Sequence, residues 1–95
     1  MLIFAPKKGR TFASVMNQLN YQQKETLIAI AKEGKASGVT SVAYVKKHAL
    51  KSPSSVQYAI STLLEKQLLT YESIERTKVY SISDRFLEMW MNRTY

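Results

Sequence analysis

The chain of 95 residues has no cysteine, two prolines, three glycines and a single histidine. Without cysteine it forms no disulfide and no thiolate metal site, so its stability must come from packing. A single histidine, with no pair of carboxylates at a recognisable spacing, offers little for acid–base chemistry or metal binding, since metal sites need several such ligands together. We therefore expect no enzyme, no metal and no cofactor.

Long apolar runs are also missing. The longest, such as residues 27–31, are a few residues long, whereas a bilayer span needs about 20. The apolar start at residues 1–6 precedes Lys7, Lys8 and Arg10, which reverses the charge order of a secretory signal. We expect a cytoplasmic protein without membrane contact.

Acidic residues are scarce relative to basic ones. Seven Asp and Glu stand against 14 Lys and Arg, which gives a formal net charge of +7. An anionic partner such as nucleic acid is the first expectation. An acidic protein partner, or a surplus of lysine that only keeps the domain soluble, stays open. Hydrophobic residues make up 45% of the chain, enough for a compact core.

The first 19 residues differ from the rest. Residues 1–10 show no clean period and are expected to form an irregular arm, with a short extended piece at 2–4. Residues 11–19 are expected to form a short leading helix, because apolar residues recur there at three- and four-residue spacing. We assign 1–19 to this arm and helix, and 20–95 to one domain. The recurring residues are Phe12, Val15, Met16 and Leu19.

A second helix is predicted from the cap at Asn20 to about Glu33. Gln23, three residues after Asn20, completes a variant of the capping box, and Gly34 is a natural terminator. After a loop at 35–39, Thr40 or Ser41 is expected to cap a shorter helix that stops at Ala49 or Leu50. The buried stripe of the longer helix is Leu27, Ile28, Ile30 and Ala31.

Ser52 and Pro53 form a strong helix start, because the serine caps free amides and proline lacks the donor that would be wasted there. The helix should run to about Lys66. Its apolar residues lie on one stripe, which leaves small or hydrogen-bonding side chains on the opposite face. The stripe comprises Val56, Ala59, Ile60, Leu63 and Leu64.

Two β-prone runs follow, at 68–72 and 79–83, and we expect an antiparallel hairpin with a charged loop at 73–78. Asp84 is expected to cap a final helix that is too apolar to be left in water. This helix must pack on the core or on another protein segment, and core burial is expected for Trp90. Its apolar residues are Phe86, Leu87, Met89, Trp90 and Met91.

The order helix, helix, short turn, helix and hairpin is that of a winged helix-turn-helix. The predicted fold class is thus mainly α with a small β-hairpin, a winged helix-turn-helix with an extra N-terminal and C-terminal helix. In this fold the third helix, here 53–66, is the one presented to DNA.

The basic bias coincides with the helix-turn-helix, since residues 35–64 contain no Asp or Glu. We therefore expect double-stranded DNA as the partner, with the third helix in the major groove. Gln57 is the best candidate for pairing with adenine, and an ordinary solvated helix face is the alternative. Glu72 and Glu75 should weaken any contact of the wing, and His48 is expected to be a helix-end cation or a phosphate contact. The predicted DNA-binding residues are Lys46, Lys47, Lys51, Ser52, Ser54, Ser55, Gln57, Tyr58, Ser61, Arg76 and Lys78.

Residues 20–90 contain three segments that together resemble a known domain. They are NYQQKETLIAIAKEGKASGVTS, LKSPSSVQYAISTLLEKQLLT and VYSISDRFLEMWM. In this order they resemble the C-terminal winged-helix domain of prokaryotic AAA-type P-loop ATPases related to the origin-recognition ATPases. The resemblance implies DNA contact or regulation of an attached ATPase domain.

The chain itself has no GxxxxGK[ST] phosphate loop, so it should not bind or hydrolyse ATP. It is either an excised domain of such an ATPase or a small independent protein. A second function therefore stays open, in which the module packs on an ATPase domain or forms a homodimer without binding DNA. The residues expected to serve it are Phe86, Met89, Trp90 and Tyr95.

Overall fold

The computed structural model describes residues 11–95. The expected irregular arm and its extended piece fall on residues 1–10 and so lie outside the described residues. The described part is mainly helical with one antiparallel hairpin, as the sequence predicts. Its elements are α1 (Phe12–Asn17), α2 (Tyr21–Glu33), α3 (Val42–Lys47), α4 (Pro53–Glu65), β1 (Leu69–Ile74), β2 (Thr77–Ile82) and α5 (Arg85–Thr94).

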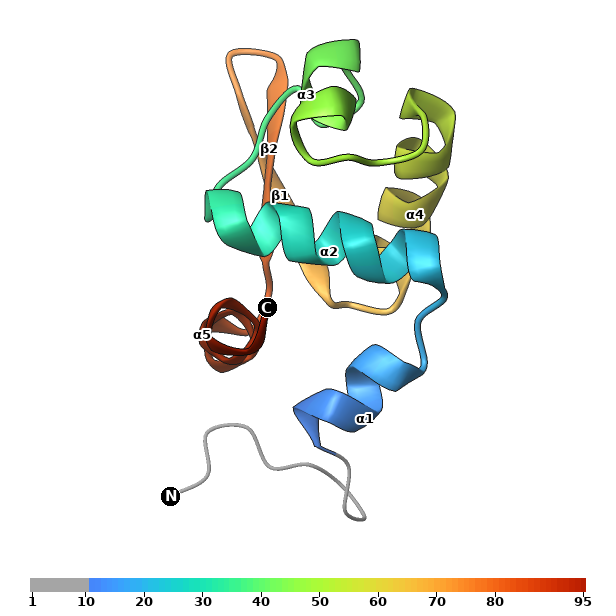
Figure 1. Ribbon diagram of the computed structural model, residues 1–95. Helices are drawn as coiled ribbons and strands as arrows, with labels where there is room; N and C mark the ends of the chain where they lie inside the picture. The colour runs from blue at the N-terminus through green and yellow to red at the C-terminus, as the bar shows by residue number, and fades with distance from the viewer. Residues whose placement is uncertain (1–10) are drawn as a thin grey trace.

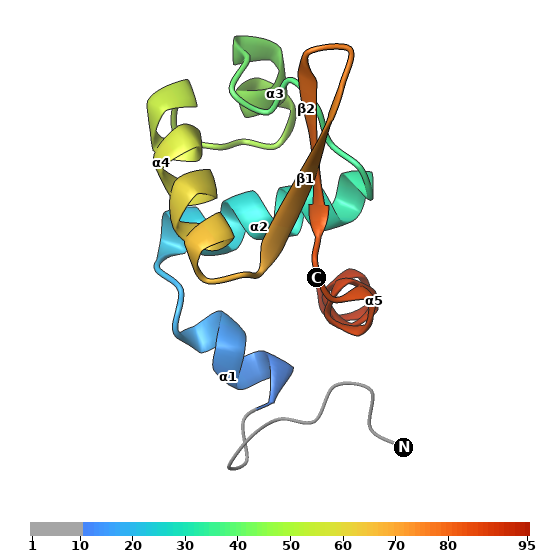
Figure 2. The same ribbon diagram turned by 180° about the vertical axis from the view of Figure 1, so that it is seen from behind.

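Helix α2 crosses the middle of the molecule and packs against α4, β2 and α5 (Figure 1). Helix α3, the start of α4 and the tip of the hairpin lie together at one end. Helices α1 and α5 lie at the opposite end, and the view from behind shows the same division (Figure 2). Among residues 11–95 no helix is long and apolar enough to cross a membrane.

The predicted start and end of α2 are confirmed. The Asn20 side chain accepts a hydrogen bond from the Gln23 amide at 2.8 Å, and the Gln23 side chain accepts one from the Asn20 amide at 3.1 Å. Gly34 ends the helix with a φ of 79°, a conformation that suits glycine. Such reciprocal capping satisfies two amides that the helix cannot pair internally, which fixes where α2 begins.

Both helices of the helix-turn-helix end in the same way. Ala49 after α3 and Gln67 after α4 adopt left-handed backbone angles, with φ of 55° and 64°. The following amides, of Leu50 and Leu68, reach back to the carbonyls of Val45 and Leu63 at 2.8 and 3.0 Å. These are Schellman caps without the usual glycine. The sequence predicts that α3 stops at Ala49 or Leu50, whereas it ends at Lys47 with His48 as its cap, and no glycine marks this end.

The hairpin is tighter than the sequence predicts. Leu69 pairs with Ile82 and Ile74 with Thr77, so the strands run further toward the tip and only Glu75 and Arg76 form the loop. Both loop residues have positive φ, 50° and 69°, as the two-residue turns that match the strand twist require. The expected charged loop at 73–78 is therefore wrong. Asparagine or glycine, which normally marks such a turn, is absent from it.

Beside the hairpin, Ala36 forms an isolated β-bridge with Tyr80 of β2. Ala36 and Tyr80 exchange two backbone hydrogen bonds, each of 2.8 Å. This bridge anchors the α2–α3 connection to the wing. The core lies between α2, α4, α5 and the inner end of the hairpin. Its most completely buried apolar side chains are Met16, Leu27, Ile30, Val56, Leu63 and Met91.

The two terminal helices differ in part from expectation. Helix α1 ends at Asn17, although Leu19 beyond it is still buried in the core. Trp90 is only partly buried, and its ring lies between Phe12 of α1 and Tyr95, with centroid distances of 5.8 and 6.0 Å. On α5, Leu87 and Met91 face the core as expected, whereas Phe86 and Met89 stay exposed.

Candidate nucleic-acid interface

Helix α4 presents a polar face to solvent. Ser54, Gln57, Tyr58 and Ser61 follow the spacing of one helix face, and all four are exposed. Tyr58 is 73% exposed, more than any other large hydrophobic side chain of residues 11–95. The opposite face of the helix is buried, so α4 is held by packing while this polar face is free. The sequence prediction that these side chains point outward is confirmed.

Two of the predicted contact residues already have a structural role at the start of α4. The Ser55 amide donates to the Ser52 hydroxyl, and the Ser52 amide donates to the Ser55 hydroxyl, both at 3.2 Å. The Ser55 hydroxyl also donates to the Ser52 carbonyl at 3.0 Å. Both residues are half-buried. This capping box orients the first turn of α4, the part that faces a groove in the expected binding mode.

The lysines around the turn between α3 and α4 are exposed, but they are not equivalent. Lys46 and Lys51 have no ion-pair partner among residues 11–95. Lys47 forms an ion pair with Glu33 of α2, with 3.0 Å between its Nζ and the carboxylate oxygen. Lys47 remains 67% exposed, so its charge is only partly compensated. Lys46 and Lys51 are the stronger candidates for phosphate contact.

His48 lies against protein rather than solvent. Its Nε2 is 2.7 Å from the same Glu33 oxygen, and its side chain is 14% exposed. Its ring packs at a tilt against that of Tyr44, with 4.6 Å between the ring centroids. Hydrogen bonds from Lys47 and then His48 lower the pKa of Glu33, and burial raises the pKa of Tyr44. A phosphate contact by His48 does not fit this burial. The residue joins the ends of α2 and α3 instead.

Lys78 and Glu72 lie on opposite faces of the wing. Lys78 lies over the ring of Tyr71 at 4.9 Å, and that ring is 5.7 Å from Tyr80 across the hairpin. Side chains alternate along a strand, so Glu72, which pairs with Val79, points to the opposite face. The expected weakening of Lys78 by Glu72 is therefore smaller than sequence proximity suggests, while Glu75 remains at the tip.

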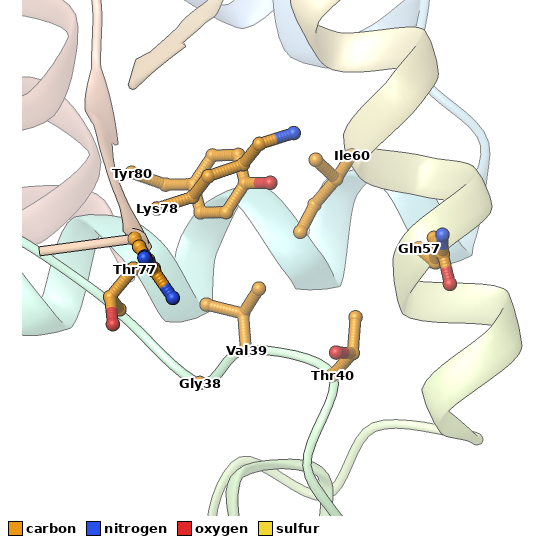
Figure 3. A pocket seen from close by; sticks show the side chains of 9 residues that line it. Gly38, Val39, Thr40, Gln57, Ile60, Thr77, Lys78 and Tyr80 are labelled. Carbon is orange, nitrogen blue, oxygen red and sulfur yellow. The ribbon is translucent and has the colours of Figure 1, made fainter. Parts of the chain in front are cut away.

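A groove of about 360 Å³ lies between α4 and the wing (Figure 3). Gln57 and Ile60 of α4 form one wall, Lys78 and Tyr80 of β2 another, and the connection 38–40 closes it. Three predicted contact residues, Gln57, Arg76 and Lys78, thus meet at one place although 21 positions separate the first from the last. The residues that line the groove are Gly38, Val39, Thr40, Gln57, Ile60, Arg76, Thr77, Lys78 and Tyr80.

Sequence reasoning missed the connection 38–40 as part of this surface. Gly38 has a φ of 63° and open space around it, so its glycine serves the backbone turn rather than a close contact. One signal was present, since 38–40 falls inside the interval without acidic residues. The lining contains no Asp or Glu, so the whole groove favours an anion. Among residues 11–95, no three His, Asp or Glu side chains gather into a possible metal site.

Comparison with known proteins identifies the domain type. Residues 10–93 match the family model described as a probable winged helix domain. No curated protein matches the chain in sequence. The match covers α1 to α4, the hairpin and all of α5 except Thr94. The chain therefore belongs to the family of probable winged helix domains.

Proposed function

We propose that this domain binds double-stranded DNA, with the N-terminal half of α4 in the major groove and the wing beside it. A single observation carries the proposal. Gln57 of the exposed polar face of α4, the connection 38–40 and the cations Arg76 and Lys78 of the wing line one groove that has no acidic lining residue. Phosphate groups supply most of the affinity in such complexes, so a surface of this charge suits a DNA backbone.

The size of α4 supports this binding mode. Its 13 residues span about 20 Å, and the major groove is about 12 Å wide, so the first two turns can enter. Glu65 ends the exposed face at the far end, where the helix would already have left the groove. Gln57 is the side chain best suited to a base edge, because its amide can pair with adenine in two places. Ser54 and Ser61 are further side chains of α4 that face bases or phosphates in this binding mode.

Salt dependence of binding provides the test. If Lys46, Lys51, Arg76 and Lys78 each neutralise one phosphate, log K falls with log salt with a slope of about −3.6. Affinity for a mixed-sequence duplex then drops by about 150-fold between 50 and 200 mM salt. Fluorescence anisotropy of a labelled duplex measures both values. No binding at low salt, where attraction is strongest, would contradict the proposal.

Two matched variants locate the contact. Lys78→Gln removes a cation from the groove and should reduce the slope by about 0.9. Lys66→Gln removes one exposed cation at the far end of α4, outside the groove, and should leave the slope unchanged. Equal slopes for both variants would show that the attraction is diffuse and that the groove is not the binding surface.

The parent protein is a separate proposal, which rests on the sequence resemblance alone. The similarity of residues 20–90 to C-terminal domains of AAA-type ATPases leads us to propose that the domain works attached to a P-loop ATPase in the cytoplasm. The test is the genomic reading frame around Met1. A GxxxxGK[ST] phosphate loop upstream in the same frame is the expected result. A stop codon directly upstream of Met1 would contradict it.

A further inference from the structure

Helix α5 keeps two large apolar side chains in solvent. Phe86 is 45% exposed and Met89 is 49% exposed. They are three positions apart, so they lie side by side on the outer face of the helix. Leu87 and Met91, on the opposite face, are buried in the core at 3% and 1% exposure. The outer face is therefore not needed to hold α5 on the domain.

Two arginines flank this apolar pair. Arg85 precedes Phe86, and Arg93 lies one turn after Met89, so the two are about 12 Å apart along the helix. Both are exposed, and neither forms an ion pair within residues 11–95. Aromatic, methionine and arginine side chains are enriched in protein interfaces. The outer face of α5 thus has an apolar centre with a positive charge at each end.

The two acidic residues nearest to this face form no ion pair with its arginines among residues 11–95. The Asp84 carboxylate accepts hydrogen bonds from the amides of Phe86 and Leu87, at 2.8 and 3.3 Å, and so caps the helix. Glu88 lies one turn before Asn92, whose side chain donates to the Ala31 carbonyl of α2 at 3.1 Å. Residues three or four positions apart share a side of a helix, so Glu88 lies on the side of Asn92 and Arg85, at the edge of the outer face. Neither Arg85 nor Arg93 forms an ion pair with it among residues 11–95.

Charge decides between possible occupants of this face. A second copy would bring four arginines together in a chain that already has a net charge of +7. The chain's own first ten residues carry Lys7, Lys8 and Arg10, which have the same sign. We propose that the outer face of α5 docks an acidic amphipathic helix of another protein, with Phe86 and Met89 as anchors and Arg85 and Arg93 pairing with its carboxylates.

This surface and the proposed DNA surface are separate. Helix α5 lies at the end of the molecule opposite α3, the start of α4 and the tip of the wing (Figures 1 and 2). Both surfaces can therefore be occupied at once, and the partner protein would be held next to DNA. The inference does not depend on DNA binding, because it rests on α5 alone.

The test uses a labelled helical peptide of about 16 residues, with leucines along one face and glutamates beside them. A second peptide carries lysine in place of each glutamate. Trp90 is the only tryptophan of the chain and packs beside the outer face, so its emission reports binding there. We expect the acidic peptide to bind with a Kd of about 100 µM or tighter and to shift this emission, and the basic peptide not to bind.

Two double variants and a control complete the experiment. Phe86→Ser with Met89→Ser should raise the Kd of the acidic peptide by about tenfold or more. Arg85→Glu with Arg93→Glu should reverse the preference toward the basic peptide. Val42→Ser, which alters a 62% exposed side chain of α3 at the other end, should change nothing. Circular dichroism of each variant verifies that the fold is kept.

Three results would overturn the proposal. The first is an acidic peptide that does not saturate below about 1 mM. The second is equal affinity for both peptides, which would mean that the arginines do not select the partner. The third is a dimer, seen by light scattering, that dissociates in the Phe86→Ser and Met89→Ser variant, because a second copy would then occupy the face. Duplex anisotropy of the Phe86→Ser and Met89→Ser variant, which keeps the net charge, stays unchanged in each case and tests DNA binding separately.

Discussion

Ser52→Ala tests whether Ser52 acts mainly as the cap of α4. The variant loses the hydroxyl that accepts the Ser55 amide at 3.2 Å. Loss of a serine N-cap costs about 1 kcal/mol, which lowers the Tm of a domain of this size by about 4–8 °C. Ser54→Ala is the matched control: it removes an exposed hydroxyl that lies 3.4 Å from the Ser52 hydroxyl but does not cap the helix, and it should change stability by less than about 0.5 kcal/mol.

If Ser52 acts only as a cap, the loss of DNA affinity caused by Ser52→Ala has an upper limit. A domain with ordinary stability stays folded at 25 °C after a loss of about 1 kcal/mol, so global unfolding does not lower affinity. If the whole loss appears as fraying of the first turn of α4, the competent fraction falls by about fivefold at most. A larger loss of affinity with an unchanged Tm would mean that the Ser52 hydroxyl contacts DNA directly.

Ser52→Asp separates capping from contact. Aspartate caps helices as well as serine does, so the Tm should stay near that of the native protein. Its negative charge at the start of α4 should weaken duplex binding, because this end faces the phosphates in the proposed mode. Thermal unfolding followed by circular dichroism, together with duplex anisotropy, measures both effects. Two results would refute the capping role of Ser52. One is that Ser52→Asp loses as much stability as Ser52→Ala, and the other is that Ser52→Ala and Ser54→Ala are equally stable.

Three further predictions concern the scaffold and the wing. Because Lys47 and His48 lower the pKa of Glu33 from its ordinary value of 4.5, this group stabilises the fold fully above about pH 4.5, and the contribution is lost as the pH falls through the lower folded value. Glu33→Gln should therefore make the free energy of unfolding, measured with urea, less dependent on pH below about pH 4.5. An unchanged pH dependence in this range would contradict the ion pair. Leu63→Ala, at a fully buried site, should cost about 2–5 kcal/mol in the same assay, and a loss below about 1 kcal/mol would argue against this core. Glu75→Asn should stabilise the turn by up to about 1 kcal/mol and tighten duplex binding, because asparagine tolerates positive φ and removes an acid; weaker binding would show that Glu75 does not face DNA.

Features encoded by neighbouring residues could be predicted from the sequence. The caps at Asn20, Ser52 and Asp84 each depend on side chains within three residues, and all three are found. The exposed face of α4 follows from the same helical spacing. The hairpin turn could not be predicted, because Glu75 and Arg76 adopt positive φ without a residue type that signals it.

Features that depend on contacts between distant segments could not be predicted from the sequence. The ion pair of Lys47 with Glu33 depends on how α2 and α3 cross, which no local pattern encodes. The groove needs the bridge between Ala36 and Tyr80, since this holds the connection 38–40 beside the wing. The free charge of Lys78 depends on the strand register, which a different turn length would have changed. Chain composition indicated an anionic partner but not the shape of the surface.

A ¹⁵N-resolved NMR titration with a mixed-sequence duplex at low salt tests the central claim most directly, because it locates the bound surface residue by residue. The claim predicts that amide shifts concentrate on residues 54–61 of α4, on the connection 38–40 and on residues 76–80 of the wing. The amides of α5, at the opposite end of the molecule, should keep their chemical shifts. Shifts concentrated on α5, or no shifts at all, would contradict it.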